Sequence, residues 1–83
     1  MLYAKFMYPN SGHEHDKEHA RNVGLIVGER YEVESISMGQ SSTSVYLKDI
    51  KGYFNSVQFD FEEDGKSIDI FKSPTYNLYL QNT

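Results

Sequence analysis

Short apolar stretches that recur along the chain, separated by turn-forming residues, are the feature that most restricts how this sequence can fold. The stretches "LYAKFM" (2–7), "TSVYLK" (43–48), "YFNSVQFDF" (53–61) and "SIDIF" (67–71) have the length and composition of strands. Between the last two, "EEDGK" (62–66) contains an Asp-Gly pair, which favours a hairpin turn. Short strands at intervals of roughly ten residues are typical of a small β-barrel or a strongly bent sheet.

Residues 16–36 depart from this simple pattern in two ways. The segment "DKEHARNVG" predicts one short helix over about residues 16–23, capped by Asp16 and closed by Gly24. Its apolar face is narrow, so the helix has to pack against a sheet to be stable. Farther along, the alternation of apolar residues slips near Ser35, which predicts a β-bulge.

The size of the chain predicts one domain over residues 1–83 with little stability to spare. It contains no cysteine, so neither a disulfide nor a thiolate metal site can reinforce the core. Association of several copies is another way to enlarge a small core, and we expect a homo-oligomer. Residues 74–83 include the alternating "TYNLYL", which predicts either a C-terminal strand on the chain's own sheet or an oligomerisation arm.

The charge and hydropathy of the chain exclude two classes of partner. The formal net charge is −4, from 8 basic and 12 acidic side chains, which argues against non-specific binding to nucleic acid. No apolar run is long enough to cross a bilayer, and "MLYAKFMYP" lacks the pattern of a signal peptide. We therefore expect a cytoplasmic protein that does not bind membranes.

Several segments resemble known sequences. The stretch "LIVGERYEV" (25–33) resembles the opening of SH3-like barrels, and "GYFNSVQFDF" (52–61) looks like their close, where a short helical turn precedes a core Phe. The set "YPNSG", "VGERYEV", "QSSTSVYL" and "FNSVQF" is similar to small uncharacterised proteins of phages and prophages of Gram-positive hosts. The resemblance implies a mainly β fold, a small SH3-like barrel with one inserted helix. It also implies an accessory role in the cytoplasm of the host cell, for example against host defence.

Two clusters of hydroxyl and amide groups form the candidate site. One lies in "GQSSTSV" (39–45) and the other is Asn55–Ser56, and pairing of residues 43–47 with 53–59 would bring them together. These groups either bond the local backbone of turns or line a pocket for a small polar ligand. Arg21 and Arg30 either hold a carboxylate or phosphate or form solvated ion pairs. Tyr8 and Asn10, which flank Pro9, complete the set. The candidate ligand-binding residues are therefore Tyr8, Asn10, Arg21, Arg30, Ser42, Thr43, Asn55 and Ser56.

Catalytic and metal-binding patterns are weak by comparison. His13, His15 and His19 fall within seven residues, and two of them are spaced for one face of a helix, but an exposed polar helix start explains them more simply. The sequence contains no Cys nucleophile, no Gly-x-Ser-x-Gly, no Walker loop and no dinucleotide fingerprint. We therefore predict a protein that is not an enzyme and that has no metal or cofactor.

These observations predict non-catalytic binding. The first hypothesis is a phage-encoded anti-defence factor that sequesters a small nucleotide-like signal of host immunity. The alternative is an inhibitor of a host defence enzyme through protein–protein contact, similar to anti-CRISPR proteins, whose acidic surface docks on a basic groove. An accessory protein of the virion or of a replication complex is a further alternative.

Overall fold

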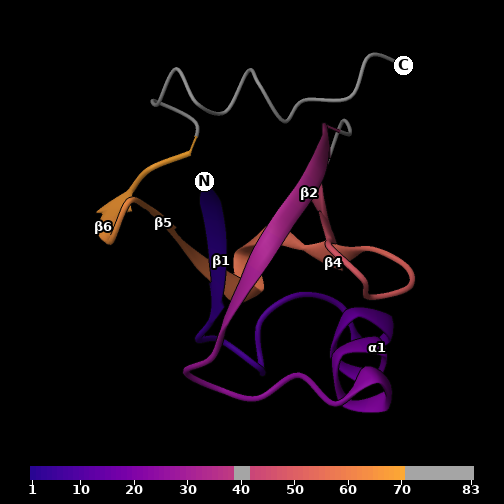
Figure 1. Ribbon diagram of the computed structural model, residues 1–83. Helices are drawn as coiled ribbons and strands as arrows, with labels where there is room; N and C mark the ends of the chain where they lie inside the picture. The colour runs from indigo at the N-terminus through magenta and orange to yellow at the C-terminus, as the bar shows by residue number, and fades with distance from the viewer. Residues whose placement is uncertain (39–41, 71–83) are drawn as a thin grey trace.

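The computed structural model describes residues 1–38 and 42–70 (Figure 1). The segments 39–41 and 71–83 lie outside the described residues, so the predictions for Gly39–Ser41 and for the arm at 74–83 are not addressed by it. The elements in chain order are β1 (Leu2–Phe6), α1 (Glu14–Val23), β2 (Arg30–Met38), β3 (Thr43–Leu47), β4 (Phe54–Asn55), the 3₁₀ turn η1 (Ser56–Gln58), β5 (Phe59–Glu63) and β6 (Lys66–Ile68).

The strands form one antiparallel sheet in the order β4-β3-β2-β1-β5-β6. The long strand β2 belongs to both halves of this sheet, because its first residues pair with β1 and the rest pair with β3 (Figure 1). The pairing with β3 shifts register between Val33 and Ser35, which confirms the predicted bulge. A bulge bends its strand and increases the local twist, so the sheet turns at this point.

The predicted fold class, mainly β with one short helix inserted after the first strand, is confirmed for the described residues. The turn η1 directly precedes the buried Phe59, while the likeness to SH3-like barrels stays a prediction. The hairpin between β5 and β6 has positive φ angles at Asp64 (52°) and Gly65 (80°), as the Asp-Gly pair predicts. In the described part of the chain β4 and β6 are the two end strands, so closure into a complete barrel stays a prediction.

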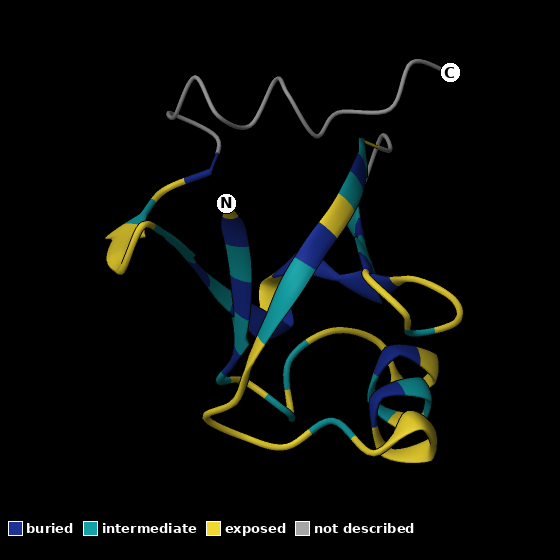
Figure 2. Cartoon of the chain, in the orientation of Figure 1, coloured by how far each residue is buried: buried dark blue, intermediate teal, exposed yellow. Residues whose placement is uncertain are grey.

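The core lies on the inner face of the bent sheet. Alternate residues of β1 are buried there (Figure 2). The same holds for β3, in which Val45 and Leu47 are fully buried as the strand pattern predicts. Burying an aliphatic or aromatic side chain of this size contributes about 1.5–3 kcal/mol. The buried apolar residues are Leu2, Ala4, Phe6, Ala20, Val33, Ile36, Val45, Leu47, Phe54, Phe59, Phe61 and Ile70.

The helix differs from the prediction at its start. It begins at Glu14 rather than near residue 16, and the residue at its N-cap is His13, so the cap predicted at Asp16 was wrong. The Asp16 carboxylate instead lies inside the first turn, where its Oδ2 accepts the His13 backbone N–H at 2.8 Å. An acid at this position, N3, satisfies the free backbone amide of the N-cap residue, which is the second half of a capping box. Gly24 closes the helix with a φ of 79°, as predicted.

The helix packs on the β4 end of the sheet (Figure 1). Ala20 is buried against the core, and the His19 ring stacks on Phe54 with 4.7 Å between ring centroids. The first turn of α1 therefore lies next to the β3–β4 pair. Within residues 1–38 and 42–70, no helix is long and apolar enough to span a membrane.

Candidate ligand-binding groove

Three adjoining hollows lie where residues 11–19 meet the β3–β4 end of the sheet, and together we call them the groove. The first, of about 670 Å³, lies between residues 11–13 on one side and residues 42–43 and 55–57 on the other. The second, of about 220 Å³, shares His13, Ser42 and Asn55 with the first. The third, also of about 220 Å³, continues from the second toward Gly52.

Strand pairing brings the two polar clusters together. β3 pairs with β4 so that Ser44 lies opposite Asn55, which confirms the predicted pairing of residues 43–47 with the start of 53–59. As a result Ser42, Thr43, Asn55 and Ser56 line the same hollow. The expected juxtaposition of the hydroxyls and the amide is therefore present, and it follows from the antiparallel register of two short strands.

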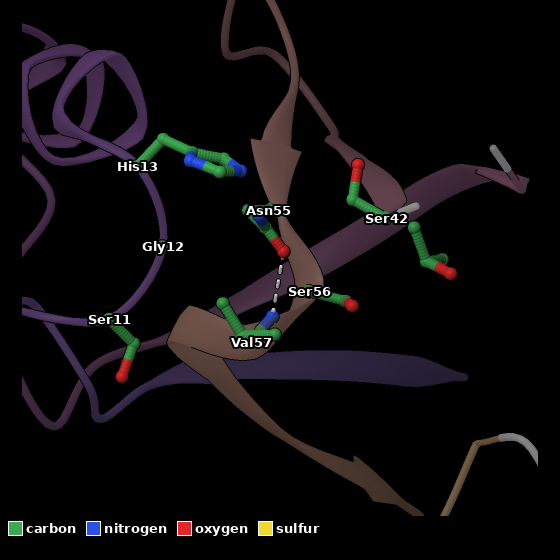
Figure 3. Close-up of a pocket in the computed structure, with 8 residues that line it drawn as sticks. Ser11, Gly12, His13, Ser42, Asn55, Ser56 and Val57 are labelled. Atoms are coloured by element: carbon green, nitrogen blue, oxygen red, sulfur yellow. Dashed lines mark hydrogen bonds between the residues drawn. The ribbon is translucent and has the colours of Figure 1, made fainter. Parts of the chain in front are cut away.

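Asp16 and Asn55 form the polar centre of the groove. Asp16 is only 6% exposed, and its Oδ2 accepts both the His13 N–H at 2.8 Å and the Asn55 Nδ2 at 3.2 Å. The other oxygen, Oδ1, lies 3.4 Å from Nε2 of His15. The Asn55 Oδ1 accepts the backbone N–H of Val57 at 3.2 Å (Figure 3). Asn55 thus bonds the local backbone of η1 and also lines the groove.

Two pairs of aromatic rings border the second hollow. The His13 and His15 rings are stacked with centroids 5.5 Å apart and planes at 10°. The Tyr46 and Tyr53 rings are tilted at 51° with centroids 6.0 Å apart. In Figure 3 the His13 ring lies to one side of the Asn55 amide. Flat rings of this kind provide stacking surfaces for a planar ligand.

Two of the predicted site residues lie outside the groove and have partners of their own. The exposed Tyr8 donates its hydroxyl to the Asp60 carboxylate, with O···O distances of 2.9 and 3.1 Å. This hydrogen bond, together with the charge of Asp60, raises the pKa of the Tyr8 phenol. Arg30 forms an ion pair with Glu62 at 3.2 Å, which corresponds to the plainer of its two predicted roles.

Asn10 and Arg21 line a separate hollow of about 230 Å³ beside the second half of α1. Lys17 lines it too, but that side chain is paired with Glu14 at 3.1 Å. The lining residues of the groove include no Lys or Arg in the described part of the chain. The expectation that an arginine and the hydroxyl cluster would act on one ligand therefore has no support in this geometry.

The sequence interpretation missed the helix side of the groove. The sequence pattern predicts an exposed helix start for His13, His15 and Asp16, and it does not single out Tyr46 or Tyr53. One signal was present: Asp16 follows the true N-cap by three residues, which is the spacing of a capping box. Within residues 1–38 and 42–70, no group of three or more His, Asp or Glu side chains is placed to hold a metal ion.

Comparison with known proteins identifies relatives of the whole chain. A family model described as "Bacteriophage T4 protein Y07B" matches residues 1–82. The chain is also 34% identical over 91 aligned positions to an uncharacterized 11.2 kDa protein in the segB-ipI intergenic region of Enterobacteria phage T4, with 100% of this chain and 94% of that protein covered. No solved structure matches the chain. The predicted likeness to small uncharacterised phage proteins is confirmed, whereas a Gram-positive host is not supported, since the hosts of phage T4 are Gram-negative.

Proposed function

The chain belongs to the bacteriophage T4 protein Y07B family, and from this premise we propose that it is a non-catalytic binding protein that holds a small nucleotide-like ligand in the groove. The observation that carries the proposal is the convergence of ring surfaces with hydroxyl and amide groups from α1, β3 and β4. Proteins that bind bases commonly combine aromatic stacking with a small number of well-placed polar groups.

The shape of the groove supports a ligand with a flat part and a polyhydroxylated or phosphorylated part. The second hollow has the ring pairs and suits the flat part, with stacking worth about 1–3 kcal/mol for one base. The larger first hollow carries the hydroxyls of Ser11, Ser42, Thr43 and Ser56, which can donate to sugar or phosphate oxygens. The ligand would therefore lie along the groove with its ring toward Tyr53.

In the infected cell, tight binding without turnover would withhold the ligand from any host protein that responds to it. We propose an anti-defence role on this basis, in which the phage protein sequesters a nucleotide-like immune signal in the host cytoplasm. The chemistry needed is affinity alone, and a small domain can supply it with stacking and hydrogen bonds.

Inhibition of a host defence enzyme by direct contact is a second candidate, and one observation favours it. The groove is lined by the Asp16 carboxylate without Lys or Arg among its described residues, and the chain carries a net charge of −4. Such a surface is complementary to a basic partner. The partner would place a cationic side chain where the first candidate places a base.

Native mass spectrometry of the protein recovered from infected, defence-active host cells tests the two candidates together. A retained small molecule supports sequestration, and a co-purified host enzyme supports direct inhibition. Tyr53→Ala should reduce the bound fraction, while Tyr8→Ala, which removes a similarly exposed tyrosine outside the groove, should not. Ser42→Ala and the exposed Ser67→Ala form a second matched pair. Equal occupancy in all four variants would contradict a binding site in the groove.

A further inference from the structure

The groove contains a buried carboxylate, Asp16, that forms no ion pair with a Lys or Arg of the described residues. Asp16 is 6% exposed and lines both the second and the third hollow. The Lys and Arg side chains with ion pairs in the described part of the chain, Lys17, Arg30 and Lys48, pair with glutamates instead. A buried charge is costly unless it is paired or hydrogen-bonded, so the partners of each Asp16 oxygen are informative.

The two oxygens of this carboxylate have different surroundings. Oδ2 is used by the structure itself, because it accepts the His13 N–H and the Asn55 amide. Among residues 1–38 and 42–70, the contact of Oδ1 is with His15 Nε2 at 3.4 Å, on a side chain that is 73% exposed. A carboxylate offers about four acceptor positions, and charge-assisted hydrogen bonds are usually shorter than 3 Å. Oδ1 is therefore a charged acceptor in the groove with capacity for a ligand.

The rings beside Asp16 restrict what can reach that oxygen. His15 and Tyr53 line both hollows that contain Asp16, and Tyr46 and His13 extend the ring surface in the second hollow. A planar group that stacks on these rings would present its edge, rather than its face, to the carboxylate. The hydrogen-bonding pattern of that edge then decides whether binding is favourable.

We propose that the groove selects a guanine-type base, whose N1–H and exocyclic amine both donate to Oδ1 of Asp16. This inference rests on the proposed function and specifies the ligand class. Guanine presents two adjacent donors on this edge, whereas adenine and cytosine place an acceptor nitrogen beside their amine. Hypoxanthine keeps the N1–H but lacks the amine. An acceptor that faces Oδ1 is repelled and leaves that oxygen without a close donor, so the site discriminates through the hydrogen bonds that Oδ1 lacks.

Isothermal titration calorimetry of the full-length protein with guanosine, inosine and adenosine monophosphates tests the inference. We expect affinity to fall in that order, with guanosine monophosphate preferred over adenosine monophosphate by roughly tenfold or more, as the loss of one hydrogen bond to a charged group requires. Asp16→Asn keeps an oxygen for the His13 N–H but loses the charge, and it should abolish the preference. Asp60→Asn changes a carboxylate that is hydrogen-bonded to Tyr8 outside the groove, and it should retain the preference.

The outcomes separate this inference from the proposed function. Equal binding of the three nucleotides would overturn the guanine preference and leave nucleotide binding in place. Binding of arginine amide without binding of any nucleotide would overturn both and favour a cationic side chain of a protein partner. Absence of binding by all four probes would also overturn both. Because the nucleotide series uses the unmodified chain, the test does not depend on the folding of Asp16→Asn, which circular dichroism would verify.

Discussion

Replacing Asn55 by alanine should cost much more stability than its single short side chain suggests. The residue is 8% exposed and joins three elements through two hydrogen bonds. Its amide nitrogen donates to the Asp16 carboxylate of α1 at 3.2 Å, and its amide oxygen accepts the Val57 N–H of η1 at 3.2 Å. Asn55→Ala removes both bonds and leaves their partners in place.

The magnitude follows from the partners that remain. A hydrogen bond to a charged group contributes about 1.5–3 kcal/mol, and here the carboxylate of Asp16 stays buried with one donor fewer. The Val57 N–H lies in a partly buried turn that water can reach, so its loss adds about 0.5–1 kcal/mol. The sum, about 2–4 kcal/mol, is a large fraction of the roughly 4–12 kcal/mol typical of a domain of this length.

Urea denaturation followed by circular dichroism measures this loss, with the exposed Asn10→Ala as the control. A double-mutant cycle with Asp16→Ala isolates the contact between the two side chains and should give a coupling of about 1–3 kcal/mol. A loss below about 0.5 kcal/mol for Asn55→Ala, or a coupling near zero, would refute the argument that this pair ties the helix to the sheet. Because Asn55 is structural in this sense, Ser42 and Tyr53 are the cleaner probes of binding.

Three other predictions concern different parts of the chain. Gly52→Ala should lower the free energy of unfolding by more than the roughly 1–2 kcal/mol that a left-handed φ costs alone, because the new Cβ would collide with the His19 ring. Gly28→Ala has a similar φ and open space around it, so it should show only that cost when both variants are unfolded in urea. The hydrogen bond that raises the pKa of Tyr8 stabilises the folded state below the pKa of the unfolded chain, 10.0, and this contribution is lost as the pH rises through the higher pKa of the folded state. The stability of the wild type should therefore fall more steeply at alkaline pH than that of Tyr8→Phe. Parallel curves of stability against pH would contradict this prediction. Removal of residues 74–83 should lower the number of subunits per particle in sedimentation if they form an oligomerisation arm, and an unchanged subunit number would end that idea.

Local chemistry determined the elements of this fold. The alternation in β1 and β3, the Asp-Gly hairpin and the Gly24 helix end are decided by residues close together in the chain, so the sequence alone predicted them. The slip at Ser35 was also readable, since one extra residue moves every later side chain to the opposite face. Even the juxtaposition of Thr43 with Asn55 followed from a single hairpin-like pairing.

The helix side of the groove was decided only by tertiary packing. The burial of Ala20 and the stacking of His19 on Phe54 set α1 against β4, and that placement carries Asp16 and the histidine rings to the polar cluster. The same packing leaves Arg21 at a different hollow. No local pattern contains this information, because it depends on which apolar surfaces separate elements bury against each other. Local patterns therefore specify the strand segments and the β3–β4 side of the groove, and the docking of α1 on the end of the sheet specifies its other side.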